Sequence, residues 1–317
     1  MRVDPSIAAL RSDRAPQRQA QAAMEAAMNA WRAETDAANA LGEFERFGEG
    51  AALEDCPSLE AIFTGQGQAE ALMQALVRHF CAAIAANPLG HPPFRNSFDG
   101  RASTLQLAKS GRAQILLQSR EPGHYDCPTA SFSENLRYDA HLAGHAKGRI
   151  VRISGPREQV HFGEEEVALQ GGARLAFDCM SEMLLVEEVE TRLVTLRLLQ
   201  SAERPQPVRE YCRDTGRLIH QAAGTLASSR CELMVAMLGR MDRADAAPVL
   251  AQVARREGED GLRWQAMREC LALDTAEGFA ALCAVARDPN DSLSDTAGAL
   301  RAQLVEQHPQ LARLENA

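Results

Sequence analysis

Four histidines in the middle of the chain could bind a metal ion: His124, His141, His145 and His161. His141 and His145 are four residues apart, so on a helix both imidazoles would lie on one face and could share a metal. On an extended strand the same step separates the two rings by roughly 13 Å, which is too far for one ion. Gly144 interrupts either element. The pattern predicts a divalent-metal site if the fold brings these histidines together, and ordinary loop and strand-end histidines if it does not.

Three arginines, Arg95, Arg101 and Arg120, border the region in which strands are expected. A guanidinium group is a planar donor that matches the geometry of carboxylates and phosphates. These residues are therefore the candidates for binding an anionic ligand. The alternative is that all three are solvated surface residues.

Other groups that could do chemistry lack a specific context. The carboxylates Glu164–Glu166 and Glu187–Glu190 could serve as acid and base, but runs of this kind are typical of solvated turns. No serine lies in a Gly-x-Ser-x-Gly motif. The sequence contains neither a phosphate-binding glycine loop nor a dinucleotide fingerprint. A non-enzymatic role is therefore favoured over an enzymatic one.

The elements that must position these residues are short strands with turns between them. From Thr104 on, the hydrophobic period approaches two, and Lys109–Arg112 (KSGR) predicts a hairpin turn in which Gly111 takes a positive φ. A second turn is expected at Gly171–Gly172. Strands are predicted over Thr104–Lys109, Ala113–Arg120, Glu134–His141, Gly148–Ser154, Arg174–Asp178, Met183–Glu188 and Thr191–Leu199.

This order and spacing resembles a cupin-like jelly roll over about 95 residues. The resemblance implies a central antiparallel β-sandwich or barrel. Metal-binding cupins carry a His-x-His pair followed by a glutamate on one strand and a third histidine on a later strand. No His-x-His pair occurs here. By analogy with the family, a shell without a metal serves as a module for ligand binding or dimerisation.

Helices are predicted on both sides of this region. Gln17–Leu41 has Met24, Met28 and Trp31 at spacings of three and four, which predicts one amphipathic helix. A second helix is expected from Gln68 to Ala86, ending before Asn87–Pro88. An irregular segment from Leu89 to Asp99 leads into the strands.

An internal repeat follows the strands. Met234–Arg255 aligns with Met267–Arg287 when one gap is allowed, and Leu238, Leu271 and Leu304 are each 33 residues apart. Each unit predicts a pair of antiparallel helices that buries its apolar face only by stacking on the next unit. The pattern resembles bacterial HEAT-like repeats, with a further helix expected from Val208 to Leu226. HEAT-like repeats usually bind another protein.

These patterns predict an α+β multidomain chain. The predicted segments are residues 1–88 (N-terminal helices), 89–200 (cupin-like β domain) and 208–317 (HEAT-like helical repeats). The proline-bearing stretch 201–208 is the predicted linker.

Composition narrows the classes of function. The chain has 317 residues and a formal net charge of -9, which makes nucleic acid an unexpected partner. It has no apolar run long enough for a membrane span and no apolar signal core, so a cytoplasmic location is expected. The eight cysteines are scattered without a CxxC pair, as small core residues would be in a reducing compartment. The high alanine and arginine content is typical of bacterial proteins.

Two functions follow from these patterns. The first is a non-enzymatic accessory or sensor protein, in which the β domain forms a homodimer or binds a small ligand and the helical repeats dock another protein; it needs no cofactor. The alternative is a metal-dependent cupin-type enzyme, an oxygenase or isomerase, with a divalent metal held by the four histidines.

Overall fold

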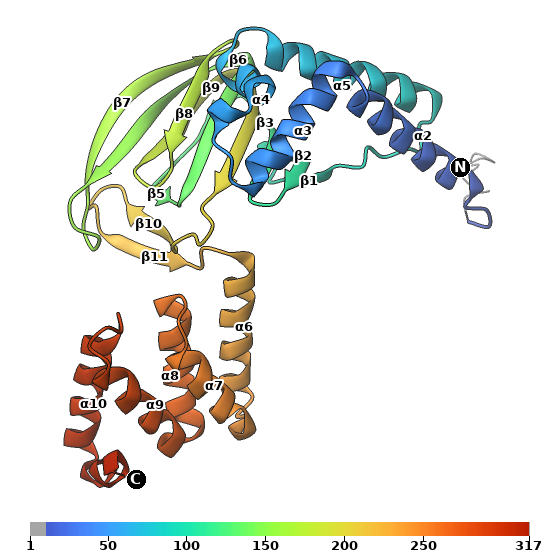
Figure 1. The fold of residues 1–317 in the computed structure, drawn as a ribbon. Helices are drawn as coiled ribbons and strands as arrows, with labels where there is room; N and C mark the ends of the chain where they lie inside the picture. The colour runs from blue at the N-terminus through green and yellow to red at the C-terminus, as the bar shows by residue number, and fades with distance from the viewer. Residues whose placement is uncertain (1–10, 317) are drawn as a thin grey trace, which may run out of the picture. The chain divides into compact units, whose positions relative to one another are not determined.

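The computed structural model describes residues 11–316, which form two compact units. The sheet unit comprises the described residues up to Glu203 together with Tyr211–Leu218. The helical unit comprises Arg204–Glu210 and the residues from Ile219 on. Figure 1 shows the elements of both units: N-terminal helices, an antiparallel sheet and C-terminal helices. Among residues 11–316 no helix is both long enough and apolar enough to cross a membrane.

The N-terminal helices follow the apolar spacing of the sequence, with one break that was not predicted. Their bounds are α2 (Ala15–Arg32), α3 (Thr35–Glu49), η1 (Leu53–Asp55), α4 (Pro57–Thr64) and α5 (Gln68–Ala86). The prediction for α5 is confirmed with the same bounds. A single helix over Gln17–Leu41 is wrong, because the chain turns out of the helix at Ala33–Glu34, where Glu34 is extended with ψ 139°. The helix α4, which begins at Pro57, was not predicted.

An eight-stranded antiparallel sheet forms most of the rest of this unit. Its main path runs β1–β2–β3–β9–β6–β7, with β4 paired to β9 and β8 paired to β6. The strands are β1 (Arg95–Phe98), β2 (Ala102–Ser110), β3 (Ala113–Arg120), β4 (Gly123–His124), β6 (Asn135–Ser154), β7 (His161–Gln170), β8 (Arg174–Asp178) and β9 (Glu182–Ser201). Both predicted glycine turns are confirmed, with Gly111 at φ 47° and Gly172 at φ 91°.

The two longest strands correct the strand prediction. β6 and β9 each run for 20 residues, where the sequence predicted two shorter strands in each place. β6 continues through Gly144, which takes φ 93°. The pairing of β6 with β9 shifts register around this glycine, and the shifts form bulges rather than ending the strand. The break predicted between strands Met183–Glu188 and Thr191–Leu199 is wrong, because Glu188, Val189 and Thr191 stay paired with β6. The irregular segment predicted before Asp99 also contains the edge strand β1.

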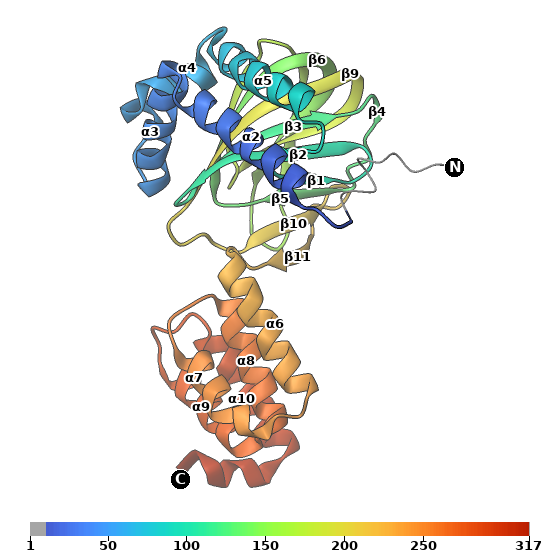
Figure 2. The same ribbon diagram turned by 90° about the vertical axis from the view of Figure 1, so that its right-hand side faces the viewer.

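One face of this sheet is buried by the helices. Leu107, Ile115, Ala140, Leu196 and Leu198 alternate along their strands and share one core cluster with residues of α2–α5. Figure 2 shows α2 and α5 in front of β2 and β3. The predicted N-terminal segment 1–88 is therefore not a separate unit, because neither the helices nor this face can bury its apolar surface alone.

Two further strands occupy the place of a predicted helix. β10 (Val208–Cys212) and β11 (Leu218–Ala222) join β5 (Thr129–Phe132) in a second sheet of order β11–β10–β5. The helix predicted over Val208–Leu226 is wrong. A turn closes the two strands instead, with Gly216 at φ 68° and its N–H bonded to the carbonyl of Cys212 at 2.8 Å. Because a Cβ on Gly216 would lie 2.0 Å from the carbonyl oxygen of Val160, only glycine fits there.

The helical unit consists of helices from Leu226 on, as predicted for this part of the chain. Its helices are α6 (Leu226–Arg240), α7 (Ala247–Arg255), α8 (Asp260–Leu273), α9 (Thr275–Arg287), α10 (Ser294–Gln307) and the 3₁₀ helix η3 (Pro309–Asn316), with a short 3₁₀ turn η2 (Ala244–Ala246). Leu250 and Leu282, which the repeat alignment places at equivalent positions, are both buried in one core. Membership of the HEAT-like class remains a prediction.

A close approach of α3 to the β2–β3 hairpin fixes how the helices lie on the sheet. A Cβ on Gly48 would lie 2.3 Å from the carbonyl oxygen of Ser110, and the Gly48 carbonyl accepts a hydrogen bond from the N–H of Arg112 at 2.9 Å. The backbones of helix and hairpin therefore touch, and a side chain at residue 48 would separate them.

We expect Gly48→Ala to lower the free energy of unfolding of the sheet unit by about 1–3 kcal/mol, because the added methyl group overpacks this contact. Gly42→Ala is the matched control, since Gly42 lies in the same helix and a methyl group added there would meet no other part of the structure within 4 Å. It should leave stability unchanged or raise it by up to ~1 kcal/mol. Urea unfolding followed by Trp31 fluorescence in a Trp264→Phe background measures both. Equal effects of the two substitutions would contradict the close-contact argument.

Candidate functional site

The face of the sheet opposite the helices has many polar side chains, with the apolar Leu116, Leu193 and Leu199 among them. Side chains alternate along a strand, so the residues between the buried apolar ones point to this second face. We call it the polar face and define it by Thr104 and Gln106 on β2, Gln114, Gln118 and Arg120 on β3, Arg137, Asp139 and His141 on β6, and Thr195 and Arg197 on β9. Thr104, Gln118, Thr195 and His141 stand directly opposite one another across these four strands.

A carboxylate with two arginines lies at the centre of the polar face. Asp139 is fully buried, and Arg197, its partner across β9, donates to both carboxylate oxygens at 2.7 and 2.9 Å. Arg137, two residues away on β6, donates to the same oxygens from Nε at 3.1 and 3.0 Å and makes a further short contact through Nη2. Burial would raise the pKa of Asp139, but the charges of Arg137 and Arg197 and their hydrogen bonds hold it far below its ordinary value.

His141 lies beside this group and is only 1% exposed. Its Nδ1 is 2.8 Å from the hydroxyl oxygen of Thr195, and its Nε2 is buried without a hydrogen-bond partner among the described residues. Burial lowers the pKa of His141 to about 4, a shift that the charge of Asp139 opposes and that the nearby arginines assist. The imidazole is therefore neutral near pH 7, as a buried ring beside several guanidinium groups must be.

Two of the three predicted anion-binding arginines come together at one end of the polar face. The guanidinium carbons of Arg101 and Arg120 lie 4.3 and 5.4 Å from the ring centre of Tyr125. The Tyr125 hydroxyl fixes the ring by donating to the carbonyl of Glu121 at 2.8 Å. Within residues 11–316 neither guanidinium group makes a hydrogen bond or an ion pair. Arg95, the third, is exposed on edge strand β1, opposite Gln106 and four positions along β2 from Ala102, the residue opposite Arg120.

The net charge of the polar face, together with Arg101 at its end, is positive. Burial lowers the pKa of Arg197, and the charges of Arg137 and Arg120 act in the same direction, so the field of Arg120 reaches the Asp139 group. The polar face contains three arginines and one carboxylate, and Arg101 adds a fourth cation at its end. In a chain with a net charge of -9, this is a local excess of the opposite sign.

The four histidines predicted as metal ligands occupy different places. His141 is on the polar face, His145 is exposed on β6, His124 is exposed and 4.0 Å from Glu188, and His161 begins β7. In the described part of the chain no three His, Cys, Asp or Glu side chains gather as a metal site would require. The side chains present therefore do not fit a metal held by three protein ligands of these types.

The carboxylate runs considered as acid–base candidates are neutralised across the strands. Glu164 and Glu187 pair with Arg149 at 3.0 and 3.1 Å, and Glu188 pairs with Lys147 at 2.9 Å. Hydrogen bonds from Arg213, and then from Arg149, keep the pKa of Glu164 below its ordinary value. These glutamates are members of ion pairs across the strands.

The Asp139 group was not predicted, although the sequence contains a signal for it. Arg137 and Asp139 stand at a two-residue step, and Thr195 and Arg197 interrupt the apolar run of β9 at the same step. Alternating charged residues in an otherwise apolar strand indicate a second, polar face. That Asp139 is opposite Arg197 depends on strand pairing between residues 58 apart, which the sequence alone does not give.

Comparison with known proteins gives only partial likenesses. No family model matches the chain, and no curated protein matches it in sequence. Similar solved structures include a cupin superfamily protein from Desulfitobacterium hafniense (15% identity, 33% of this chain, 83% of that chain, TM-score 0.25). A second is the capsular polysaccharide assembling protein CapF of Staphylococcus aureus, with 14% identity over 43% of this chain and 37% of that chain and a TM-score of 0.29. A third is the 7S globulin of Momordica charantia, with 11% identity over 38% of this chain and 35% of that chain and a TM-score of 0.27. The chain spans little more than a third of the last two, and likeness of this extent carries no argument about function.

Because His141 is neutral when folded but would bind a proton when unfolded, we expect it to make stability depend on pH. From pH 6.5 down to about 4 the unfolded state gains this proton and the folded state does not. The free energy of unfolding should therefore fall as pH is lowered through this window, by about 1.4 kcal/mol per pH unit from this residue.

Urea unfolding at pH 7, 6 and 5, again followed by Trp31 fluorescence without Trp264, measures the effect. His141→Asn should remove this part of the pH dependence, whatever it does to stability at pH 7. The matched control is His145→Asn, an exposed histidine on the same strand, which should keep the slope. If both variants show the slope of the unmodified protein, His141 is not the titrating group.

Proposed function

We propose that the protein is a non-enzymatic accessory or sensor protein whose polar face binds a small anionic ligand. The observation that carries this proposal is the pair of guanidinium groups of Arg101 and Arg120, held over one tyrosine ring without a carboxylate partner in residues 11–316. Each guanidinium group has a planar fork of N–H donors that matches a carboxylate or phosphate.

The Asp139 group supports the same proposal. Both of its arginines donate to one carboxylate through Nε and Nη2, which leaves a net positive charge whose field reaches Arg120. An anion at Arg120 would relieve the repulsion between these cations without displacing an internal ion pair. The ligand class that fits is a dicarboxylate or a phosphate, which can contact Arg101 and Arg120 together.

Docking of another protein belongs to the same proposal and is assigned to the helical unit. Leu233, Met234 and Met237 on α6 and Met241 directly after it are each more than half exposed, although α6 is the first helix of the helical unit. An end helix of a stacked array normally presents a polar outer face. Flexible methionine side chains suit a surface that accepts an apolar helix of a partner. Homodimerisation through the sheet unit remains a second proposal for its partner.

We expect Arg120→Gln to weaken the binding of succinate and of inorganic phosphate by roughly tenfold or more, because one charge-assisted hydrogen-bonding group is lost. The affinity of Arg120→Lys should lie between that of the unmodified protein and that of Arg120→Gln, since lysine keeps the charge but not the planar donor fork. Isothermal titration calorimetry at low ionic strength measures the affinities, which should decrease as salt is added.

The matched control is Arg32→Gln, which removes an exposed arginine at the end of α2 and should change neither affinity. The proposed anion binding at the polar face is contradicted if neither anion binds, or if Arg32→Gln and Arg120→Gln have equal effects. Circular dichroism of each variant confirms that the sheet is unchanged.

A further inference from the structure

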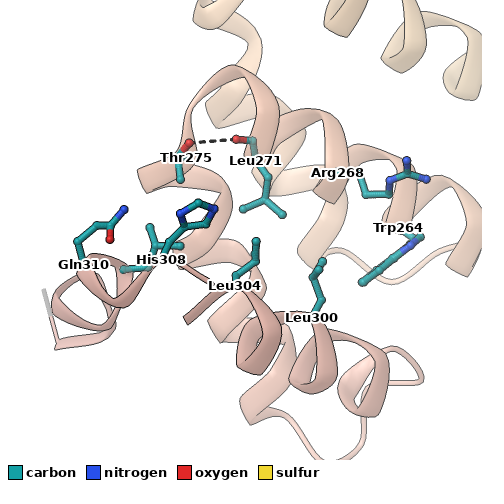
Figure 3. A pocket seen from close by; sticks show the side chains of 9 residues that line it. Trp264, Arg268, Leu271, Thr275, Leu300, Leu304, His308 and Gln310 are labelled. Atoms are coloured by element: carbon teal, nitrogen blue, oxygen red, sulfur yellow. Dashed lines mark hydrogen bonds between the residues drawn. The ribbon is translucent and has the colours of Figure 1, made fainter. Parts of the chain in front are cut away.

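The helical unit contains a cavity of about 620 Å³ between α8, α10 and η3. Figure 3 shows its arrangement: Leu271, Leu300 and Leu304 lie in the middle, Arg268 lies beside Trp264 at one end, and His308 and Gln310 lie at the other. The volume falls within the range of roughly 300–1,000 Å³ that is usual for small-molecule sites.

The cavity follows from the way the third helical pair is built. In the first two pairs the second helix, α7 or α9, is α-helical and covers the apolar side of its neighbours. After α10 the chain instead forms the 3₁₀ helix η3, of which Leu311 is buried. Leu271 and Leu304, whose equivalents recur at 33-residue steps, are therefore only partly covered. The apolar surface formed by these leucines is therefore not covered by a further α-helix, and the space above it is the cavity.

Several polar groups at the rim are available to a ligand. For the residues that the structure describes, the side chains of Arg268, His308 and Gln310 make no hydrogen bond or ion pair. Thr275 donates to the carbonyl of Leu271 at 3.3 Å and so is already engaged. Arg268 is the charged residue of the lining, which contains no carboxylate among the described residues. A ligand that fills the cavity would therefore meet the guanidinium group of Arg268, the side chains of His308 and Gln310, and an apolar floor.

We propose that this cavity binds an amphipathic carboxylate, an aliphatic chain with one anionic end. The carboxylate binds Arg268, and the chain lies over Leu271, Leu300 and Leu304. The far end of the chain reaches His308 and Gln310, which can accept a polar substituent. The site is in the helical unit, so it does not depend on the anion site proposed at Arg120.

Trp264 provides a direct measurement, because the chain has only two tryptophans and Trp31 is 2% exposed in the core of the sheet unit. In a Trp31→Phe background we titrate sodium decanoate below its micelle-forming concentration and follow Trp264 emission. Saturable binding with a shift to shorter wavelength is expected, because the chain replaces water beside the indole. Acetate, which has the head group alone, should cause no shift.

Matched variants separate charge from burial. Arg268→Gln should weaken decanoate binding roughly tenfold while leaving the binding of uncharged decanol unchanged. Arg256→Gln, an exposed arginine of the same unit outside the cavity, is the control and should have no effect. Leu304→Asn should weaken decanoate and decanol alike. Arg120→Gln should leave the Trp264 response unchanged, so failure of the anion site and failure of this cavity are distinguishable.

Three outcomes would overturn the proposal: no saturable change in Trp264 emission, equal effects of Arg268→Gln and Arg256→Gln, or loss of the response on Arg120→Gln. If Trp31→Phe does not fold, calorimetric titration of decanoate into the unmodified chain and into its Arg268→Gln variant decides the same question.

Discussion

The pairing of β6 with β9 is the constraint on which the rest of the sheet unit depends. The two strands stay paired from Asn135 opposite Ser201 to Arg152 opposite Glu182. Since side chains alternate with a period of two, a slip of β6 by one residue would exchange the two faces of that strand. It would turn Ala140 away from the helices and drive Asp139 into their core. Gly144 lies among the register shifts of β6. Only glycine fits there, because a Cβ would lie 2.2 Å from the carbonyl oxygen of Arg192.

With this register fixed, the Asp139 group determines the chemistry of the polar face. A buried carboxylate is costly unless its oxygens are hydrogen-bonded and its charge is compensated, and Arg137 and Arg197 do both. Two guanidinium groups and one carboxylate together have a net charge of +1. That charge, Arg120 and the neutral His141 lie on one face, so the field there is positive although the chain as a whole is acidic.

Local features of the fold could be predicted from the sequence, because they are set by residues close together in it. The α5 helix and the turns at Gly111 and Gly172 depend on apolar spacing and on backbone conformations that glycine adopts easily. The long strands could not, since the charged residues Glu187 and Glu188 resemble a turn until their partners Arg149 and Lys147, about 40 residues away, are known. Arg101 and Arg120 were identified as candidates, whereas the Tyr125 ring that joins them was not.

The distribution of arginine partners ties the two proposed sites together. Arg149, Arg152 and Arg213 lie on the sheet surface, and each contacts two or more glutamates, because an acidic chain offers many carboxylates at little cost. Arg120 and Arg268 have no such partner among the described residues, yet each lies beside an aromatic ring. Neither guanidinium group forms an ion pair within residues 11–316, although the charge of Arg120 helps to lower the pKa of Asp99. Both positions can therefore offer a cation to an anion from outside the chain.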